Sequence, residues 1–362
     1  MTTHYIITNR LVTRVPTSGS IKVNATEFLR TDGADEAQDN LRYGEVRFTE
    51  RTIANKVKDN QAISLDDVKI VLHPDLHRED YTDPDQYEKA AKDFTFGSQK
   101  VFDKLHQQGS EEKHEGDILV FVHGFNNDLR ESIETLCQLH VKYIREGSPI
   151  KHIVLFTWPA RKNLLSYRDD ARDAIKSGYA LARALDKLRA QFRALIHGHG
   201  VLCDHRMHLM AHSMGNRVVE AMMTELLASG TRPNNLFGEI FLMAADVDDD
   251  CMAPQKPMHQ LISLGERVHA YYHRNDVALG VSEKTKNAFN RLGRWGSRRT
   301  IDLPDDVYQA EVTYVVDEDT RGLRNLFSSP VGYINHWYYL KSDAVVNDVI
   351  EVLNGKVTTF NY

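Results

Sequence analysis

The sequence has few cysteines and lacks any long apolar run. The three cysteines, Cys137, Cys203 and Cys251, form no CxxC pair and leave one over in any disulfide count, so we expect reduced thiols in the core. No segment reaches the roughly 20 apolar residues that a membrane-spanning helix needs. The N-terminal MTTHYIITNRLVTR has too short an apolar stretch for a signal peptide. These absences predict a cytoplasmic protein that does not associate with a membrane.

The sequence also lacks a strong charge of one sign. Its 362 residues carry a formal net charge of −6, and no run of Lys and Arg is interleaved with aromatic residues. A nucleic acid is therefore not an expected partner. Hydrophobic residues make up 41% of the chain and charged residues 27%, which is normal for a globular protein with a sizeable core.

From Asp117 onward, short apolar runs alternate with longer amphipathic segments. The pattern predicts strands over 118–125, 152–158, 208–213, 239–246, 267–273 and 308–317. It predicts helices over 129–145, along an apolar face from Ile175 to Phe192, from about Asn216 to a C-cap at Gly230, and near 342–354. Continuous apolar strands between amphipathic helices are typical of an α/β fold with a mostly parallel central sheet and helices on both faces.

The first 114 residues are less regular. HYIITNRLV and YGEVRF predict strands, whereas the polar stretches 31–40, 50–66 and 73–92 predict loops or short irregular pieces. We assign residues 1–114 to edge strands and loops of the same domain, and 115–362 to its core. A separate small N-terminal domain is the alternative.

Ser213 is the candidate nucleophile. A serine hydroxyl reacts poorly near neutral pH unless it is held rigidly beside a base. One solution places it on a sharp turn between a strand and a helix, with small residues two positions before and after it. Ala211, Ser213 and Gly215 have this spacing in such a context, although the usual pattern has glycine where Ala211 stands. The alternative is a serine that only caps the following helix.

A base and an acid should follow the nucleophile along the chain, each just after a strand. His336 is the only histidine after His273, and it lies between the last predicted strand and the last helix. The alternative for His336 is a surface or packing role. For the acid, we favour Asp276, because it follows the strand next to the one that leads to His336. Asp246 and Asp248, after the preceding strand, compete for this role.

Two backbone N–H groups are expected to bind the oxyanion that forms when a carbonyl is attacked. Met214, which follows the nucleophile, supplies one. Phe125 supplies the other from the loop after the first core strand, where Gly124 permits close backbone approach. Trp158 is either a pocket residue or a core residue. Trp295 lies in the segment 277–307, which is long enough for a small flap, so we expect a small cap or none.

A histidine cluster around the serine raises the possibility of zinc. It comprises His197, His199, His205, His208 and His212. On a strand, His208 and His212 would share a face but stand about 13 Å apart, at roughly 3.3 Å per residue. One ion cannot bridge that distance, and zinc needs three or four convergent ligands. We expect no metal here.

Six segments occur in an order that resembles the alpha/beta-hydrolase superfamily: ILVFVHGFNND, VLFTWPA, AHSMGN, FLMAADVD, YYHRND and NHWYY. More narrowly, the chain resembles a bacterial esterase/lipase-like branch of unknown function over roughly residues 115–355. The resemblance implies Ser213 as nucleophile, His336 as base and Asp276 as acid, with no cofactor.

We therefore expect a serine hydrolase that cleaves small carboxylic esters through an acyl-enzyme. Thioesters and amides share the same tetrahedral chemistry, and the sequence leaves the acyl chain length and the oligomeric state open. The alternative, kept open by Ala211 and by the irregular N-terminal part, is a catalytically silent hydrolase-like protein that binds a partner or ligand.

Overall fold

The computed structural model describes residues 1–10, 41–73, 82–110, 116–161, 166–199, 206–230, 235–285, 289–320 and 334–360. Over these residues the chain builds one nine-stranded sheet with the strand order β3-β2-β1-β5-β4-β6-β7-β8-β9. The strands are β1 (Thr2–Thr8), β2 (Arg42–Phe48), β3 (Val68–Leu72), β4 (Asp117–Val122), β5 (Ile150–Thr157), β6 (Met207–His212), β7 (Phe237–Met243), β8 (Gly265–Tyr272) and β9 (Val307–Glu311).

The sheet is mostly parallel, as predicted. Among the strands of the described residues, only the β1–β2 and β2–β3 pairs run antiparallel, and β1 joins the parallel part through β5. β6 lies between β4 and β7, and β8 lies between β7 and β9, all in parallel register. The carboxyl ends of the core strands therefore meet at one edge of the sheet, where ligands of open α/β sheets usually bind.

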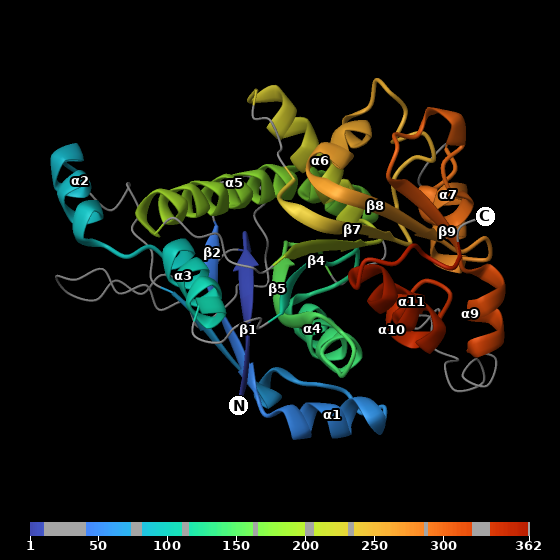
Figure 1. The fold of residues 1–362 in the computed structure, drawn as a ribbon, viewed down its shortest axis with the longest axis horizontal. Helices are drawn as coiled ribbons and strands as arrows, with labels where there is room; N and C mark the ends of the chain where they lie inside the picture. The colour runs from blue at the N-terminus through green and yellow to red at the C-terminus, as the bar shows by residue number, and fades with distance from the viewer. Residues whose placement is uncertain are drawn as a thin grey trace.

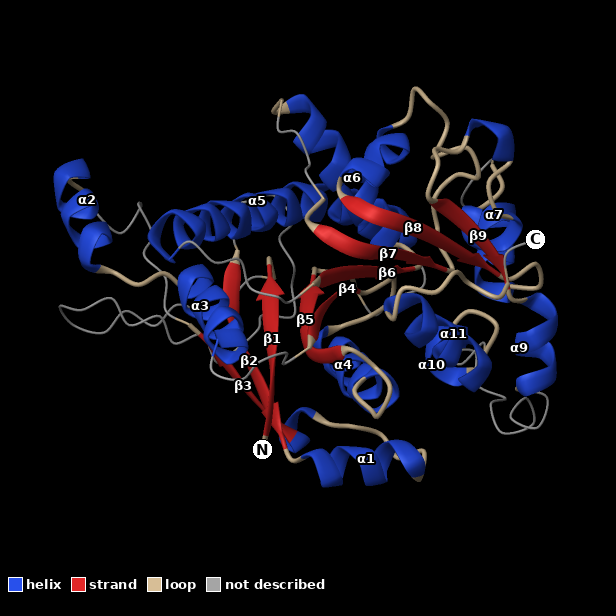
Figure 2. Ribbon diagram, viewed as in Figure 1, coloured by secondary structure: helices blue, strands red, loops and turns tan. Residues whose placement is uncertain are grey.

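Helices cover both faces of this sheet (Figures 1 and 2). The α-helices are α1 (Glu50–Lys58), α2 (Pro84–Asp93), α3 (Gly97–Ser110), α4 (Leu129–Tyr143), α5 (Tyr167–His199), α6 (Gly215–Ala228), α7 (Val277–Thr285), α8 (Leu292–Trp295), α9 (Thr313–Asp319), α10 (Tyr338–Lys341) and α11 (Asp343–Leu353). The 3-10 helices are η2 (Leu65–Asp67), η5 (Pro257–Ser263) and η6 (Thr300–Asp302).

Two apolar clusters form the core, one on each face of the sheet. α5 and α6 pack on one face, with Leu181 and Val218 among the buried residues. α4 and α11 pack on the other face with residues such as Leu136 and Val349. Gly178 lets α5 and α6 approach closely, because a Cβ there would lie 2.4 Å from the Cβ of Ala221.

The N-terminal part corrects one prediction. β1, β2 and β3 extend the central sheet, but 50–66 contains α1 and the start of η2, and 73–92 contains most of α2, so neither stretch is a loop throughout. α1 buries Ile53 on the α4 side of the sheet, and Asp83 caps α2 by accepting from the Asp85 N–H at 3.0 Å. These polar helices depend on caps and long-range contacts that apolar periodicity does not reveal. The predicted loop 31–40 lies outside the described residues.

The predicted strand 308–317 and the predicted face of α5 are also corrected. β9 ends at Glu311, and the chain continues as α9. Val312 and Val316 are buried whereas Tyr314 between them is exposed, which fits a helix, because on a strand all three would share one face. On α5, Ile175 points to solvent.

Two further predictions are tested by the fold. Cys137 and Cys251 are free, buried thiols as predicted, whereas Cys203 lies outside the described residues. Within the ranges given above, no helix combines the length and the apolar character needed to cross a membrane.

Candidate active site

Ser213 sits on a strained turn between β6 and α6. Its φ is +53°, a left-handed conformation that non-glycine residues seldom adopt. Its N–H donates to the carbonyl of Met243 on β7 at 3.0 Å, which ties the turn to the sheet. A helix N-cap has an extended backbone instead, and Met214 occupies the position before α6. The N-cap interpretation of Ser213 is therefore wrong.

Small residues surround the serine because neighbouring backbones leave no room. A Cβ on Gly215 would lie 2.6 Å from the carbonyl oxygens of Val122 and His123, and a Cβ on Gly124 would lie 2.8 Å from the Cβ of Ser213. Ala211 is wholly buried within β6, so its methyl group is accommodated at the usual glycine position. The turn thus has the tight approach that its spacing predicts.

Asn216 locks the turn from inside α6. Its Nδ2 donates to the carbonyls of Ala211 and Ser213, at 3.1 and 3.0 Å. The N–H of Asp246 also donates to the Ser213 carbonyl, at 3.1 Å. These bonds satisfy the polar backbone of the turn and oppose its relaxation.

His336 pairs with Asp276. Nδ1–H of His336 donates to Oδ2 of Asp276 at 2.7 Å, and both side chains are buried. The other carboxylate oxygen of Asp276 accepts from the Leu279 N–H at 2.9 Å, which fixes the carboxylate at the start of α7. The carbonyl of His336 accepts from Nε2–H of His212, the residue before Ser213, at 3.0 Å. The histidine and the serine are thus held at the same edge of the sheet.

The competing carboxylates make other contacts. Asp246 accepts from the hydroxyls of Tyr167 and Ser282, at 2.6 and 3.1 Å. Asp248 pairs with Arg291 at 2.7 Å. Of these three aspartates, Asp276 is the one that contacts His336.

His123 and Trp158 shape the loop after β4 that carries Phe125. The Trp158 N–H donates to Nε2 of His123, so Nδ1–H donates to the Gly124 carbonyl, at 3.0 and 2.9 Å. Burial lowers the pKa of His123 to about 3, which keeps the ring neutral. The Trp158 ring stacks on His123, and its Nε1–H donates to the His123 carbonyl at 2.8 Å. Trp158 is wholly buried, so it is a core residue, the second of the two roles left open for it.

Arg10 also supports this loop, and sequence reasoning missed it. The buried guanidinium donates from Nη2 to the Asn127 carbonyl at 2.8 Å and from Nε to the Thr157 hydroxyl at 3.0 Å. Arg10 follows β1, which pairs with β5. The sequence feature that indicates such a role is a basic residue directly after an apolar strand, in the segment TNR.

The remaining predicted site residues lie on nearby segments. Met214 precedes α6, and the half-buried Phe125 packs its ring edge against Tyr167 at 5.4 Å. Trp295 ends α8, where it is 41% exposed and donates from Nε1 to Glu283 at 3.0 Å. α8 packs closely against the end of β7, since a Cβ on Gly293 would lie 2.1 Å from the Ala245 nitrogen.

The histidines near Ser213 have separate partners. His208 contacts Asp117 at 3.1 Å near the amino end of the sheet, whereas His212 contacts the loop of His336. In the described part of the chain, no group of three or more His, Cys, Asp or Glu residues is arranged to hold a metal ion. His205 and the side chains of His197 and His199 lie outside that part.

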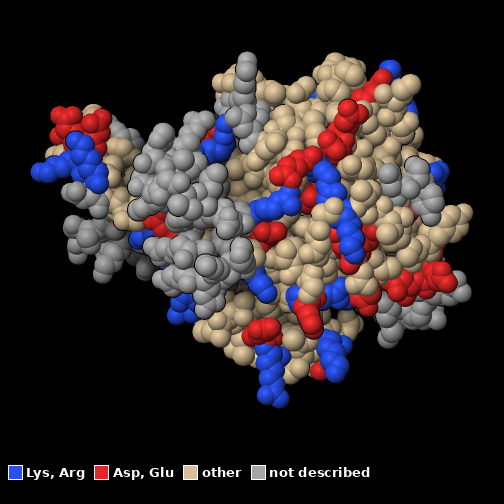
Figure 3. Space-filling model, in the orientation of Figure 1, with Lys and Arg blue, Asp and Glu red and all other residues tan. Residues whose placement is uncertain are grey.

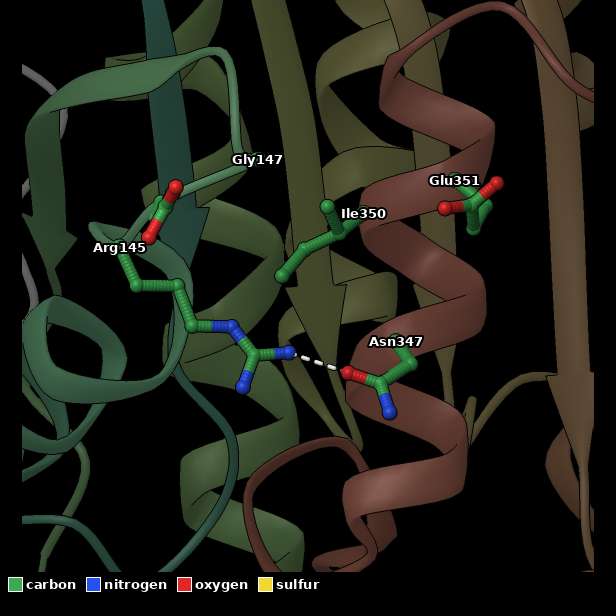
Figure 4. Close-up of a pocket in the computed structure, with 6 residues that line it drawn as sticks. Arg145, Gly147, Asn347, Ile350 and Glu351 are labelled. Carbon is green, nitrogen blue, oxygen red and sulfur yellow. Dashed lines mark hydrogen bonds between the residues drawn. The ribbon is translucent and has the colours of Figure 1, made fainter.

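A surface pocket of about 360 Å³ lies elsewhere, between the turn after α4 and helix α11 (Figure 4). Its lining includes Arg145, which donates to Asn347, and Gly147, which precedes β5. This is the amino end of β5, about 26 Å of strand away from the carboxyl edge, at roughly 3.3 Å per residue. The pocket is therefore not part of the site around Ser213.

On the face shown in Figure 3, basic and acidic side chains are interspersed.

Comparison with known proteins identifies the family. A family model described as an alpha/beta hydrolase of unknown function (DUF900) matches residues 99–353. The chain belongs to this family. Its nine-stranded sheet and flanking helices are accordingly an alpha/beta-hydrolase fold. An uncharacterized protein of Nostoc sp. (strain PCC 7120) is similar to this chain, with 21% identity over a match that covers 56% of the chain and 59% of the relative.

Proposed function

We propose that the protein is a serine hydrolase that cleaves carboxylic esters through an acyl-enzyme. The observation that carries the proposal is the buried His336–Asp276 pair, which lies against the residue that precedes the strained Ser213. Acyl transfer by a serine commonly requires a rigidly held serine beside a histidine that an acid orients.

In this mechanism, Ser213 Oγ attacks the ester carbonyl carbon while Nε2 of His336 takes the hydroxyl proton. Asp276 accepts from Nδ1–H, which fixes the tautomer and stabilises the imidazolium. The tetrahedral intermediate collapses when the C–O bond of the alcohol breaks, and His336 returns the proton to the departing alkoxide. Water then attacks the acyl-enzyme with His336 again as base, which releases the acid and restores Ser213.

The N–H groups of Phe125 and Met214 would bind the oxyanion of each intermediate. The support for Phe125 is the contact between Gly124 and Ser213, which brings this loop against the nucleophile. The support for Met214 is its place directly before α6, where N–H groups at a helix start have no intrahelical partner. Trp295, on the partly exposed α8, is the proposed residue of a small cover over the substrate.

Replacing Asp276 and Asp246 in turn tests the assignment of the acid. In Asp276→Asn, an amide cannot stabilise the imidazolium and favours the wrong tautomer, so we expect a fall in turnover of a p-nitrophenyl ester on the order of 10⁴-fold. Asp246→Asn is the matched control, since Asp246 contacts Tyr167 and Ser282 rather than His336. It should retain activity within about tenfold. Loss of activity only in the Asp246 variant would refute Asp276 as the acid.

A panel of p-nitrophenyl esters of increasing acyl length, assayed beside Ser213→Ala, tests the substrate class. We expect hydrolysis that Ser213→Ala abolishes. Hydrolysis that survives in Ser213→Ala would show that another group does the chemistry. No turnover of any ester by the wild-type protein would favour the silent, ligand-binding alternative.

A further inference from the structure

His212 lies between the nucleophile turn and the segment that carries His336. Its Nε2–H donates to the His336 carbonyl at 3.0 Å. Its ring contacts the rings of His336, Trp337 and Tyr339, with centroids 4.7, 4.4 and 4.8 Å away. A side chain adjacent to Ser213 thus holds the backbone and the ring of the proposed base at once.

The protonation state of His212 follows from its surroundings. Burial, reinforced by the neighbouring His336, holds the pKa of His212 well below its usual range, so the ring stays neutral. A carbonyl only accepts hydrogen bonds, so the single ring proton is on Nε2. Nδ1 is buried without a hydrogen-bond partner among the described residues, close to Gly124, whose ideal Cβ would lie 3.2 Å from it.

A packing role alone does not account for this residue. Leaving a buried polar atom such as Nδ1 without a partner costs free energy, and an apolar ring would fill the same space among Trp337 and Tyr339 without that cost. What histidine adds at this position is the Nε2–H donor. Its acceptor is the main chain of the base itself.

We propose that His212 is a positioning residue, whose Nε2–H bond to the main chain of His336 keeps the His336 imidazole aligned with Asp276 and Ser213. The catalytic consequence rests on the proposed hydrolase function, whereas the alignment itself does not. Reacting groups lose about 10²-fold in rate when they are misplaced by about 1 Å. The bond from His212 fixes the position of His336, and His336 alone transfers the proton.

Two substitutions separate the effect of the His212 Nε2–H donor from the effect of the size of the His212 ring. His212→Phe keeps an aromatic ring but has no donor, and His212→Gln places an amide donor near the Nε2 position. Proton NMR of the wild-type protein should show a downfield signal from the Nδ1–H that His336 donates to Asp276, assigned by its loss in Asp276→Asn. We expect this signal to broaden or vanish in His212→Phe and to return in His212→Gln, at unchanged cooperative unfolding.

The same variants give a kinetic readout. In His212→Phe, kcat for a p-nitrophenyl ester should fall about 10- to 100-fold with KM within about threefold, and His212→Gln should recover most of it. If His212→Phe does not fold, His212→Leu takes its place. An unchanged downfield signal and kcat in a folded variant without the donor would overturn the proposal. A wild-type protein that shows the signal, loses it in His212→Phe, yet cleaves no ester would retain the positioning role and refute the hydrolase.

Discussion

Ser213 is held at φ +53° by residues that leave no space for larger neighbours. The backbone carbonyls of β4 lie against Gly215, and the side chain of Ser213 lies against Gly124. Strain of this kind costs on the order of 1–3 kcal/mol and persists only where the surroundings enforce it. The strained turn therefore lowers stability while it holds the hydroxyl of the buried Ser213 in one orientation.

Gly124→Ala tests the close approach between the loop and the nucleophile. Its added methyl would lie 2.8 Å from the Ser213 Cβ, so the loop must move and carry the Phe125 N–H with it. We expect ester turnover to fall about 10²-fold or more, since losing one oxyanion donor has that effect. Gly280→Ala is the matched control, because its Cβ would first meet the flexible Arg294 head, at 3.4 Å. Wild-type turnover in Gly124→Ala would contradict this role.

At this scale, the sequence predicts a candidate nucleophile, acid and base, whereas the residues that hold them in place cannot be predicted from it. The chain predicts Ser213, Asp276 and His336 through their order and their places after strands. Arg10 and His212 act through contacts between segments more than 100 residues apart in sequence. No local pattern reveals such pairs, and the positive φ of Ser213 follows from packing against β4 and β7 rather than from serine itself.

At the scale of elements, β1 links the N-terminal part to the proposed oxyanion loop. The strand pairs with β5, and Arg10 just beyond it reaches the carbonyl of Asn127 after β4. The Thr157 hydroxyl at the end of β5 accepts a second bond from Arg10 and lies 3.1 Å from His123. The N-terminal strand thereby contacts the loop whose geometry the mechanism needs.

Arg10→Met tests this link. It leaves a buried carbonyl and a hydroxyl without their donor, so we expect a loss of about 1–3 kcal/mol in the free energy of unfolding and a clear fall in kcat. Urea unfolding and ester kinetics measure the two effects. Arg206→Met is the control, because Arg206 forms a partly exposed ion pair with Glu266, and such pairs contribute little. Full activity in Arg10→Met would show that β1 does not influence the proposed oxyanion loop through Arg10.

The elements differ in how far they could be predicted. β4, β6 and β7 are mainly apolar runs that are buried on both faces of the sheet, so the sequence marks them strongly. α1 and α2 are short and polar; α1 packs against the core through Ile53, and α2 begins at the cap that Asp83 provides. The sequence predicts too long a strand at β9, because Val312 and Val316 suit a buried helix face as well as a strand.

At the scale of the whole molecule, buried neutral histidines couple stability to pH. Burial is the largest cause that lowers the pKa of each of His4, His73, His123, His140, His212, His269 and His273. In the unfolded chain these rings bind a proton near pH 6.5. Below that pH the unfolded state holds more protons than the folded state, so stability falls as the pH falls. The raised pKa values of Glu220 and Asp249 act in the opposite direction.

Urea unfolding at pH 7.5 and pH 5 checks this coupling. His123 alone, with its pKa at about 3, should account for about 2 kcal/mol of lost stability between pH 6.5 and 5, at about 1.4 kcal/mol per pH unit. The contribution of His123 to the free energy of unfolding is present in full above about pH 6.5 and decreases as the pH falls toward 3. The urea m-value should stay constant, so that the change reflects stability rather than the extent of unfolding. A free energy of unfolding that is equal at the two pH values would contradict the neutral, buried state of these rings.

The most direct test of the account is whether Ser213 reacts as a nucleophile. A fluorophosphonate probe reacts with activated serines, and intact-mass measurement followed by peptide mapping locates the adduct. We predict one adduct on Ser213 of the wild-type protein, none on Ser213→Ala, and an adduct that forms much more slowly on Asp276→Asn than on Asp246→Asn. A folded wild-type protein that gains no adduct, or gains it on another residue, would contradict the account.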